Sequence, residues 1–175
     1  MNHTDHVMLI KKGITPGGMW ADLGSGDGAF TLALRDVAGA DIEIYSVDQD
    51  GNRLDRQKEA FAFKFPQTNI YYLKQDFTSR LELPQLDGII MANSLHYVKE
   101  QMAYLSGLKK YLKLKARLVL VEYNADQGNQ WVPYPISFQR FGKLAKEAGF
   151  ASPQYLHGVP SQFLNEIYAA VTTVK

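Results

Sequence analysis

Three glycines at alternate positions, Gly24, Gly26 and Gly28, follow a short apolar run that begins at Met19. A segment with helical apolar periodicity begins at Phe30, directly after them. A strand, a glycine turn and a helix in this order bring backbone close to a nucleotide and direct helix N–H groups toward it. The first two glycines allow a tight turn and close approach of a ligand, and Gly28 allows the helix to pack closely on the strand. A glycine triplet alone is equally compatible with a plain turn, so the residues that follow decide its meaning.

Two carboxylates end the next two apolar runs. Asp48 lies 20 residues after Gly28 and closes the run that begins at Ile42. A carboxylate at this place in a nucleotide-binding fold accepts hydrogen bonds from both ribose hydroxyls. Asp76 ends the following run in the same way, where its side chain and a backbone N–H match the donor and acceptor edge of an adenine. The alternative for both aspartates is an ordinary turn or loop residue.

His96 is the residue best suited to proton transfer. It follows the continuously apolar run 88–92, whose end faces the predicted nucleotide site, and it would act as a general base if the substrate carries a proton. The alternative is a histidine that only packs against or caps the next helix. Four aromatic residues near the ends of the fourth and fifth runs predict a water-excluding substrate pocket, although each is equally compatible with ordinary packing: Tyr97, Tyr123, Trp131 and Tyr134.

These residues need a scaffold in which strands alternate with helices. The pattern predicts strands over 19–23, 42–48, 70–73, 88–92 and 117–123, with two closing strands near 155–157 and 163–174. It predicts helices over 7–12, 30–38, 51–65, 99–114 and 137–148. The chain is therefore expected to form one α/β domain over 1–175, with a leading helix and loop at 1–18 and a core at 19–175.

Composition narrows the function further. Lys and Arg total 19 against 18 Asp and Glu, so charge gives no reason to expect a nucleic-acid or anionic-membrane partner. The absence of cysteine excludes disulfides, thiolate nucleophiles, cysteine zinc sites and iron–sulfur clusters. Four scattered histidines make no metal site. Without a secretory signal or an apolar run long enough to span a membrane, a cytoplasmic location is expected.

The ordered set of motifs resembles class I S-adenosylmethionine-dependent methyltransferases. The resemblance runs from about Met19 to the C-terminus and rests on Asp22-Leu23-Gly24-Ser25-Gly26-Asp27-Gly28, Val47-Asp48, Gln75-Asp76-Phe77, Leu86-Asp87-Gly88-Ile89-Ile90-Met91-Ala92-Asn93-Ser94-Leu95-His96, and Leu118-Val119-Leu120-Val121-Glu122-Tyr123. It implies a Rossmann-like, mostly parallel sheet of seven strands with helices on both faces, in which the last strand is antiparallel and lies beside the fifth. It also implies S-adenosylmethionine as cofactor.

The resemblance assigns roles residue by residue. The glycine loop would hold the methionine part, Asp48 the ribose, and Asp76 with the Phe77 N–H the adenine. Asn93 would lie near the methionine part where substrate enters, and Asp22 would orient the glycine loop or a water beside it. Gln49 stands where the family often has an apolar residue against the adenine. The residues expected to contact the cofactor are thus Asp22, Gly24, Ser25, Gly26, Gly28, Asp48, Gln49, Asp76, Phe77 and Asn93.

The methyl acceptor is expected to be a small molecule. Asn93-Ser94-Leu95-His96 is not the Asn/Asp-Pro-Pro-aromatic motif of enzymes that methylate planar amines, and the charge balance is neutral. The chain adds little to the core fold for substrate recognition. The acceptor is therefore small, or a second copy of the chain in a homo-oligomer completes the pocket.

Two other functions remain open from the sequence. Gly24-x-Gly26-x-x-Ala29 also satisfies the fingerprint of an NAD(P)-dependent oxidoreductase, and Tyr111-x-x-x-Lys115 mimics the catalytic pair of short-chain dehydrogenases. Against this reading, Asp22 and Gly28 fit the methyltransferase loop better, and Tyr111 and Lys115 are expected at the end of a helix. The second alternative is a non-catalytic, cofactor-binding interaction module.

Overall fold

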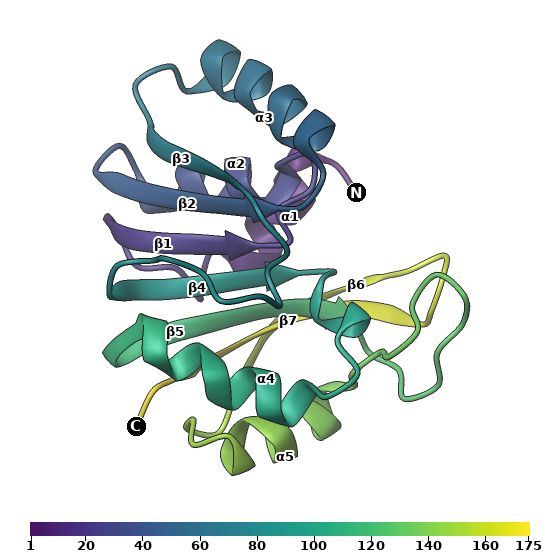
Figure 1. Ribbon diagram of the computed structural model, residues 1–175. Coiled ribbons are helices and arrows are strands. Elements are labelled where there is room, and N and C mark those ends of the chain that lie inside the picture. Colours follow the sequence, from purple (N-terminus) through teal and green to yellow (C-terminus); the bar gives the residue numbers. More distant parts are fainter.

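The computed structural model describes residues 1–175 and contains one sheet of seven strands in the order β3-β2-β1-β4-β5-β7-β6 (Figure 1). The first five strands are parallel, and β7 runs antiparallel between β5 and β6. This confirms the predicted fold class. The strands are β1 (Gly18–Leu23), β2 (Ile42–Asp48), β3 (Asn69–Lys74), β4 (Leu86–Ala92), β5 (Leu112–Tyr123), β6 (Gln154–Pro160) and β7 (Glu166–Thr173).

Five α-helices cover the two faces of the sheet (Figure 1). They are α1 (His3–Ile10), α2 (Ala29–Ala38), α3 (Gly51–Lys64), α4 (Gln101–Leu108) and α5 (Phe138–Glu147). The buried side chains of α1, α2 and α3 pack in one cluster with Trp20 and Ile90, while those of α4 and α5 pack in another with Ile89 and Met91. Adjacent residues of β4 therefore enter opposite cores, which explains why this strand is continuously apolar. No helix is long and apolar enough to cross a membrane.

The leading helix begins earlier than predicted, at His3 instead of Val7. Asn2 caps it: its side chain accepts from the N–H of Asp5, and the Asp5 carboxylate accepts from the N–H of Asn2. This reciprocal capping satisfies backbone donors at the helix start. The helix packs against α2, with His3 bonded to Asp36.

The predicted helix over 99–114 is wrong at its C-terminal end. The helix α4 stops at Leu108, a single turn of 3₁₀ helix covers Lys109–Tyr111, and β5 begins at Leu112. Leu112 pairs with Leu86, and the register then shifts before Gly88 pairs with Arg117. Tertiary pairing thus overrides the helical propensity of this lysine-rich segment.

Candidate functional site

A cleft of about 510 Å³ lies at the carboxyl ends of the parallel strands. The turns after β1, β2, β3 and β4 all reach it, because parallel strands end at the same edge of a sheet. Its lining residues are Gly24, Asp48, Gln49, Asp50, Arg53, Asp76, Phe77, Thr78, Asn93, Ser94 and Tyr97. The structure therefore brings six of the predicted cofactor residues and one predicted substrate residue into a single cleft.

The glycine loop is held by the end of the neighbouring strand. The N–H groups of Gly24 and Ser25 both donate to the carbonyl of Val47, at 2.9 and 3.0 Å. Gly24 has φ 80°, and a Cβ there would lie 2.6 Å from the Cβ of Ser94. Only glycine therefore fits at this position of the loop.

A buried glutamine on α3 supports the glycine loop. Gln57, on α3, is fully buried, and its Nε2 donates to the Gly26 carbonyl at 3.2 Å. Its Oε1 accepts from the hydroxyl of Ser46 at 2.7 Å. Gly28, with φ 86°, packs against this side chain, since a Cβ would lie 2.4 Å from the Gln57 Cγ. The sequence predicted that Gly28 lets its helix pack closely on the preceding strand. In the structure, the close contact of Gly28 is with α3. Sequence reasoning missed Gln57, although it is a polar residue inside the apolar stripe between Leu54 and Phe61.

Asp48 joins the glycine loop to the start of α3. Its Oδ2 accepts from the N–H of Gly26 at 2.8 Å, and its Oδ1 accepts from the N–H of Asp50 at 2.9 Å. A carboxylate has about four acceptor positions, so two remain for hydroxyl groups of a ligand. Asp48 is therefore placed and held as a ribose-binding carboxylate requires.

Asp76 and Phe77 present free polar groups in the same cleft. One carboxylate oxygen of Asp76 accepts from the N–H and the hydroxyl of Thr78, at 2.8 and 2.7 Å, and the other has no partner in the protein. The N–H of Phe77 makes no hydrogen bond, while its ring lies edge-on to Tyr104 with the centroids 5.9 Å apart. An acceptor and a donor are thus available together, as adenine recognition needs.

Asn93 carries an unpartnered acceptor. Its backbone is left-handed, with φ 53°, and its N–H donates to Val121 at 2.8 Å. Its side-chain Oδ1 is buried and has no hydrogen-bond partner. A buried polar atom without a partner costs about 1–3 kcal/mol. A donor from a ligand, such as the ammonium group of a bound methionine part, would satisfy it. The residues of the cleft therefore fit the predicted cofactor.

The cleft also contains a cation that sequence reasoning missed. Arg53, in the first turn of α3, has its Nε 3.7 Å from a carboxylate oxygen of Asp50. Its guanidinium group lies over the glycine loop, 3.4 Å from where a Cβ of Gly26 would stand. Arg53 is the one basic side chain among the lining residues. Its helical position does not reveal from sequence that it turns toward the loop.

His96 is buried beside the cleft and does not line it. Its Nδ1 lies 2.8 Å from Oε2 of Glu122, and its backbone N–H donates to Oε1 of the same carboxylate at 3.1 Å. The side chains of His96 and Glu122 are only 3% and 0% exposed. Tyr97 is 61% exposed and has its ring centroid 4.3 Å from that of His96. Glu122 was missed as a partner, although a lone acid within an apolar strand is a usable signal.

The predicted substrate aromatics are only partly brought together. The ring centroid of Tyr123 lies 5.8 Å from that of His96, and burial raises the pKa of Tyr123. The N–H of Tyr134 donates to the His96 carbonyl at 3.0 Å. Trp131 is 68% exposed and does not line the cleft. The rings of Tyr97 and Tyr123 therefore lie beside His96, Tyr134 contacts it through the backbone, and Trp131 lies apart.

The carboxyl group of Asp22 is hydrogen-bonded to α2. The side chain is buried beneath α2, and its Oδ2 accepts from the hydroxyl of Thr31 at 2.6 Å. Burial raises the pKa of Asp22 to about 7. Asp22 thus ties β1 to α2 and makes no hydrogen bond to the glycine loop.

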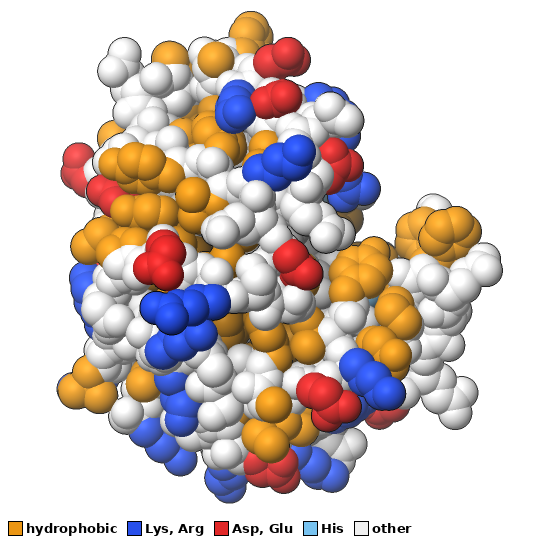
Figure 2. Space-filling model, in the orientation of Figure 1, with side chains coloured by type: hydrophobic (Ala, Val, Ile, Leu, Met, Phe, Trp, Pro, Cys, Tyr) orange, Lys and Arg blue, Asp and Glu red, His pale blue; other side chains and the backbone are white.

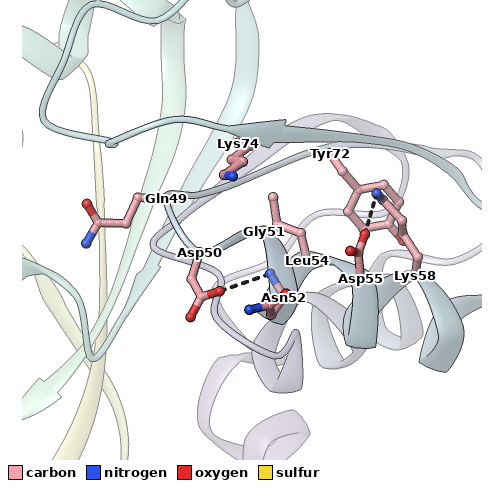
Figure 3. A pocket seen from close by; sticks show the side chains of 9 residues that line it. All are labelled: Gln49, Asp50, Gly51, Asn52, Leu54, Asp55, Lys58, Tyr72 and Lys74. Atoms are coloured by element: carbon pink, nitrogen blue, oxygen red, sulfur yellow. Dashed lines mark hydrogen bonds and ion pairs between the residues drawn. The ribbon is translucent and has the colours of Figure 1, made fainter.

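A second hollow, of about 550 Å³, lies on the outer side of the segment that follows β2 (Figure 3). Asp50 caps α3 there by accepting from the N–H of Asn52, and Lys58 pairs with Asp55 at 2.9 Å. Gln49 points away from the other labelled side chains, and it lines both the hollow and the cleft. Gln49 therefore forms part of the wall between the two.

The pair that favoured an oxidoreductase lies elsewhere. Tyr111 is buried, and its hydroxyl accepts from the N–H of Leu81 at 2.9 Å. Lys115 is exposed near the start of β5, whereas the cleft lies at the end of the parallel strands. Tyr111 ends the 3₁₀ turn Lys109–Tyr111, whereas Lys115 lies in β5, so the prediction that both end a helix is wrong for Lys115, and neither lines the cleft.

Comparison with known proteins identifies the family. The family model described as a methyltransferase domain matches residues 14–149, which is most of the chain. The chain belongs to this family. Its membership confirms the resemblance to class I S-adenosylmethionine-dependent methyltransferases.

Individual relatives agree with this assignment. The chain is 28% identical over 129 residues to the 2-phytyl-1,4-naphthoquinone methyltransferase of Nostoc sp. strain PCC 7120, a match that covers 71% of this chain and 55% of that protein. A SAM-dependent methyltransferase from Aquifex aeolicus has a TM-score of 0.72 at 19% identity, covering 98% of this chain and 93% of the other. Magnesium protoporphyrin IX methyltransferase from Synechocystis PCC 6803 has a TM-score of 0.71 at 18% identity, covering 98% and 77%. The two structures share the fold, and the chain spans about half the length of the Nostoc protein.

Proposed function

We propose that the chain binds S-adenosylmethionine in the cleft and transfers its methyl group to a small molecule. The cleft carries this proposal, because it brings the glycine loop, Asp48, the free oxygen of Asp76 and the unpartnered Oδ1 of Asn93 together. The bound cofactor supplies an electrophilic methyl group on a sulfonium. Asp48 and Asp76 would hold the adenosine part of the cofactor, and Asn93 would hold its methionine part.

The acceptor that best fits the neighbouring surface is a flat, uncharged ring compound with a hydroxyl group. The rings of Tyr97 and Tyr123 lie beside His96, Tyr134 bonds to the His96 carbonyl through its backbone N–H, and the nearest acid, Glu122, is buried against that histidine. The name of the Nostoc relative, a naphthoquinone methyltransferase, supports a flat ring acceptor, while the hydroxyl group is inferred from the position of His96. Ring stacking on tyrosines would position such an acceptor and exclude water.

His96 would take the acceptor proton. Its Nδ1 is held by the Glu122 carboxylate, so Nδ1 carries the hydrogen and Nε2 is left as the basic nitrogen. The bound cofactor would supply the methyl group to the acceptor oxygen, and Nε2 of His96 would accept the hydroxyl proton that this oxygen loses. Because the His96 side chain is only 3% exposed, side chains around it must move aside when the acceptor binds.

The direct test is acceptor-dependent formation of S-adenosylhomocysteine. The protein would be incubated with methyl-labelled S-adenosylmethionine and with hydroxylated aromatic compounds, aliphatic acids or amines, and products would be measured by mass spectrometry. We expect turnover with hydroxylated aromatic compounds. His96→Gln is expected to lower kcat about 10²- to 10⁴-fold without changing cofactor affinity. His157→Gln, in β6, is the matched control. Full activity of His96→Gln would show that His96 is not the general base. The absence of product with every acceptor would contradict the proposed methyltransferase activity.

A further inference from the structure

Two loops beyond the carboxyl ends of the strands form one projection, which we call the aromatic arm. It consists of residues 124–135, between β5 and α5, and residues 161–165, between β6 and β7. Their bases are joined, because the N–H of Asn124 donates to the Glu166 carbonyl at 2.8 Å and its side chain donates to the Glu166 carboxylate at 2.9 Å. The arm extends past the rest of the molecule on the side where the parallel strands end (Figure 1).

The arm exposes large aromatic side chains on well-formed turns. Trp131 and Phe163 are 68% and 70% exposed. Asn129 accepts from the N–H groups of Trp131 and Val132, both at 2.9 Å, and Ser161 accepts from the N–H of Phe163 at 3.1 Å. Hydrophobic atoms lie at the outer end of the projection (Figure 2). The turns therefore hold the aromatic rings outward without covering them.

The chemistry of the arm favours a neutral lipid surface. Its residues include no Lys or Arg and one acid, Asp126. Tryptophan and tyrosine rings prefer the interface between lipid headgroups and acyl chains. A second copy of the chain is a poorer fit, because a stable protein interface needs about 800 Å² of complementary surface on each partner, and two projecting loop tips offer a small convex one.

We propose that the aromatic arm inserts Trp131 and Phe163 into the interfacial layer of a lipid bilayer. The base of the arm adjoins the acceptor side of the cleft, since Tyr134 donates to the His96 carbonyl and Gln101 donates to the Tyr134 carbonyl at 2.7 Å. If the proposed function holds, docking brings the cleft to an acceptor dissolved in the membrane; docking itself does not depend on it. A net charge near zero and the lack of a spanning helix do not exclude this contact, because it depends neither on charge nor on a segment that crosses the bilayer.

The two tryptophans make the test selective. Trp20 is fully buried in the core, and Trp131 is exposed on the arm. We expect vesicles of pure phosphatidylcholine to shift the emission of Trp131 to shorter wavelength, and brominated phosphatidylcholine to quench it. Binding should survive ionic strength near 1 M, where charges are screened beyond about 3 Å. Trp131→Ser and Phe163→Ser should each weaken sedimentation with vesicles by roughly tenfold.

Phe63→Ser is the matched control, because Phe63 is 93% exposed but lies on α3, away from the arm. We expect it to bind vesicles like the unchanged protein. Three results would overturn the proposal: an equal loss of vesicle binding in all three variants, no vesicle binding by the unchanged protein, or binding only to anionic vesicles at low salt. A shift of the Trp131 emission to shorter wavelength that is caused by self-association in the absence of lipid would also overturn the proposal. Affinity for S-adenosylhomocysteine is expected to stay unchanged in the variants, so failure of cofactor binding and failure of docking are separate results.

Discussion

The burial of single charged groups has measurable consequences, and Asp22 is the clearest case. Its carboxyl group is buried under α2, and its pKa is raised from 3.8 to about 7. The folded protein therefore holds this proton more tightly than the unfolded chain does. Its contribution to stability is largest below about pH 4 and is lost as the pH rises toward 7. The loss amounts to at most about 4 kcal/mol, because each unit of pKa corresponds to about 1.4 kcal/mol.

Asp22→Asn removes this titration and keeps an acceptor for the Thr31 hydroxyl. We expect the free energy of unfolding of the variant to increase relative to that of the unchanged protein from about pH 4 to about pH 8, because only the unchanged protein loses stability as the pH rises. Urea unfolding at several pH values measures the difference. A difference that stays constant over this range would contradict the assigned burial of a titrating carboxyl.

The pair of His96 and Glu122 makes a prediction about stability that is independent of catalysis. Glu122→Leu leaves the ring and backbone N–H of His96 without an acceptor in the core. We expect a loss of about 3 kcal/mol or more in unfolding free energy. Glu122→Gln keeps an acceptor and is expected to lose less. Equal stability of Glu122→Leu and the unchanged protein would show that the pair is not formed.

At the scale of elements, the glycine loop depends on how α2 and α3 meet. Gly28 caps α2 with a left-handed backbone and lies against Gln57 of α3. Gly28→Ala adds both backbone strain and a collision, so we expect a loss of about 3 kcal/mol. Gln57→Ala removes the colliding atoms, and the double variant should recover about 1–2 kcal/mol relative to the sum of the single changes. Thermal or urea unfolding of the four proteins measures this coupling, and simple additivity would contradict the contact.

The alternation of apolar runs and turn residues was enough to predict the elements that build the cleft. The strand ends at Leu23, Asp48 and Ala92 follow from apolar runs that stop at polar or glycine residues. The start of β5 was predicted wrongly because its pairing with β4 is a long-range contact that local propensity does not contain.

The residues of the candidate site also fall into two groups, those that could be predicted from the sequence and those that could not. Asp48 and Asp76 were predictable because they stand at or just after the end of a strand, and Asn93 was predicted from the family resemblance. Gln57 and Arg53 were missed because their roles arise where α3 turns back onto the glycine loop, which only the folded chain shows. The contact between His96 and Glu122 was missed for a similar reason, because it joins the ends of two strands that are 26 residues apart in the sequence.

At the scale of the whole molecule, the parallel order of the sheet is what creates the site. Groups from Gly24 to Asn93 converge because β1, β2, β3 and β4 end at one edge. The aromatic arm grows from the same edge, after β5 and between β6 and β7. The fold therefore places the cofactor cleft, the tyrosines around His96 and the proposed lipid contact on one side of the molecule.

The most direct test of this account is calorimetric titration with S-adenosylhomocysteine, with NAD and NADP as controls. Two aspartates flank β2: Asp48 at its end, in the cleft, and Asp41 before its start, exposed. We predict saturable binding of S-adenosylhomocysteine and no binding of either dinucleotide. Asp48→Asn should weaken the binding at least about tenfold, as expected when charge-assisted hydrogen bonds are lost, and Asp41→Asn should not change it. Unchanged affinity in Asp48→Asn, or binding of a dinucleotide instead, would contradict the assignment of the cleft to S-adenosylmethionine.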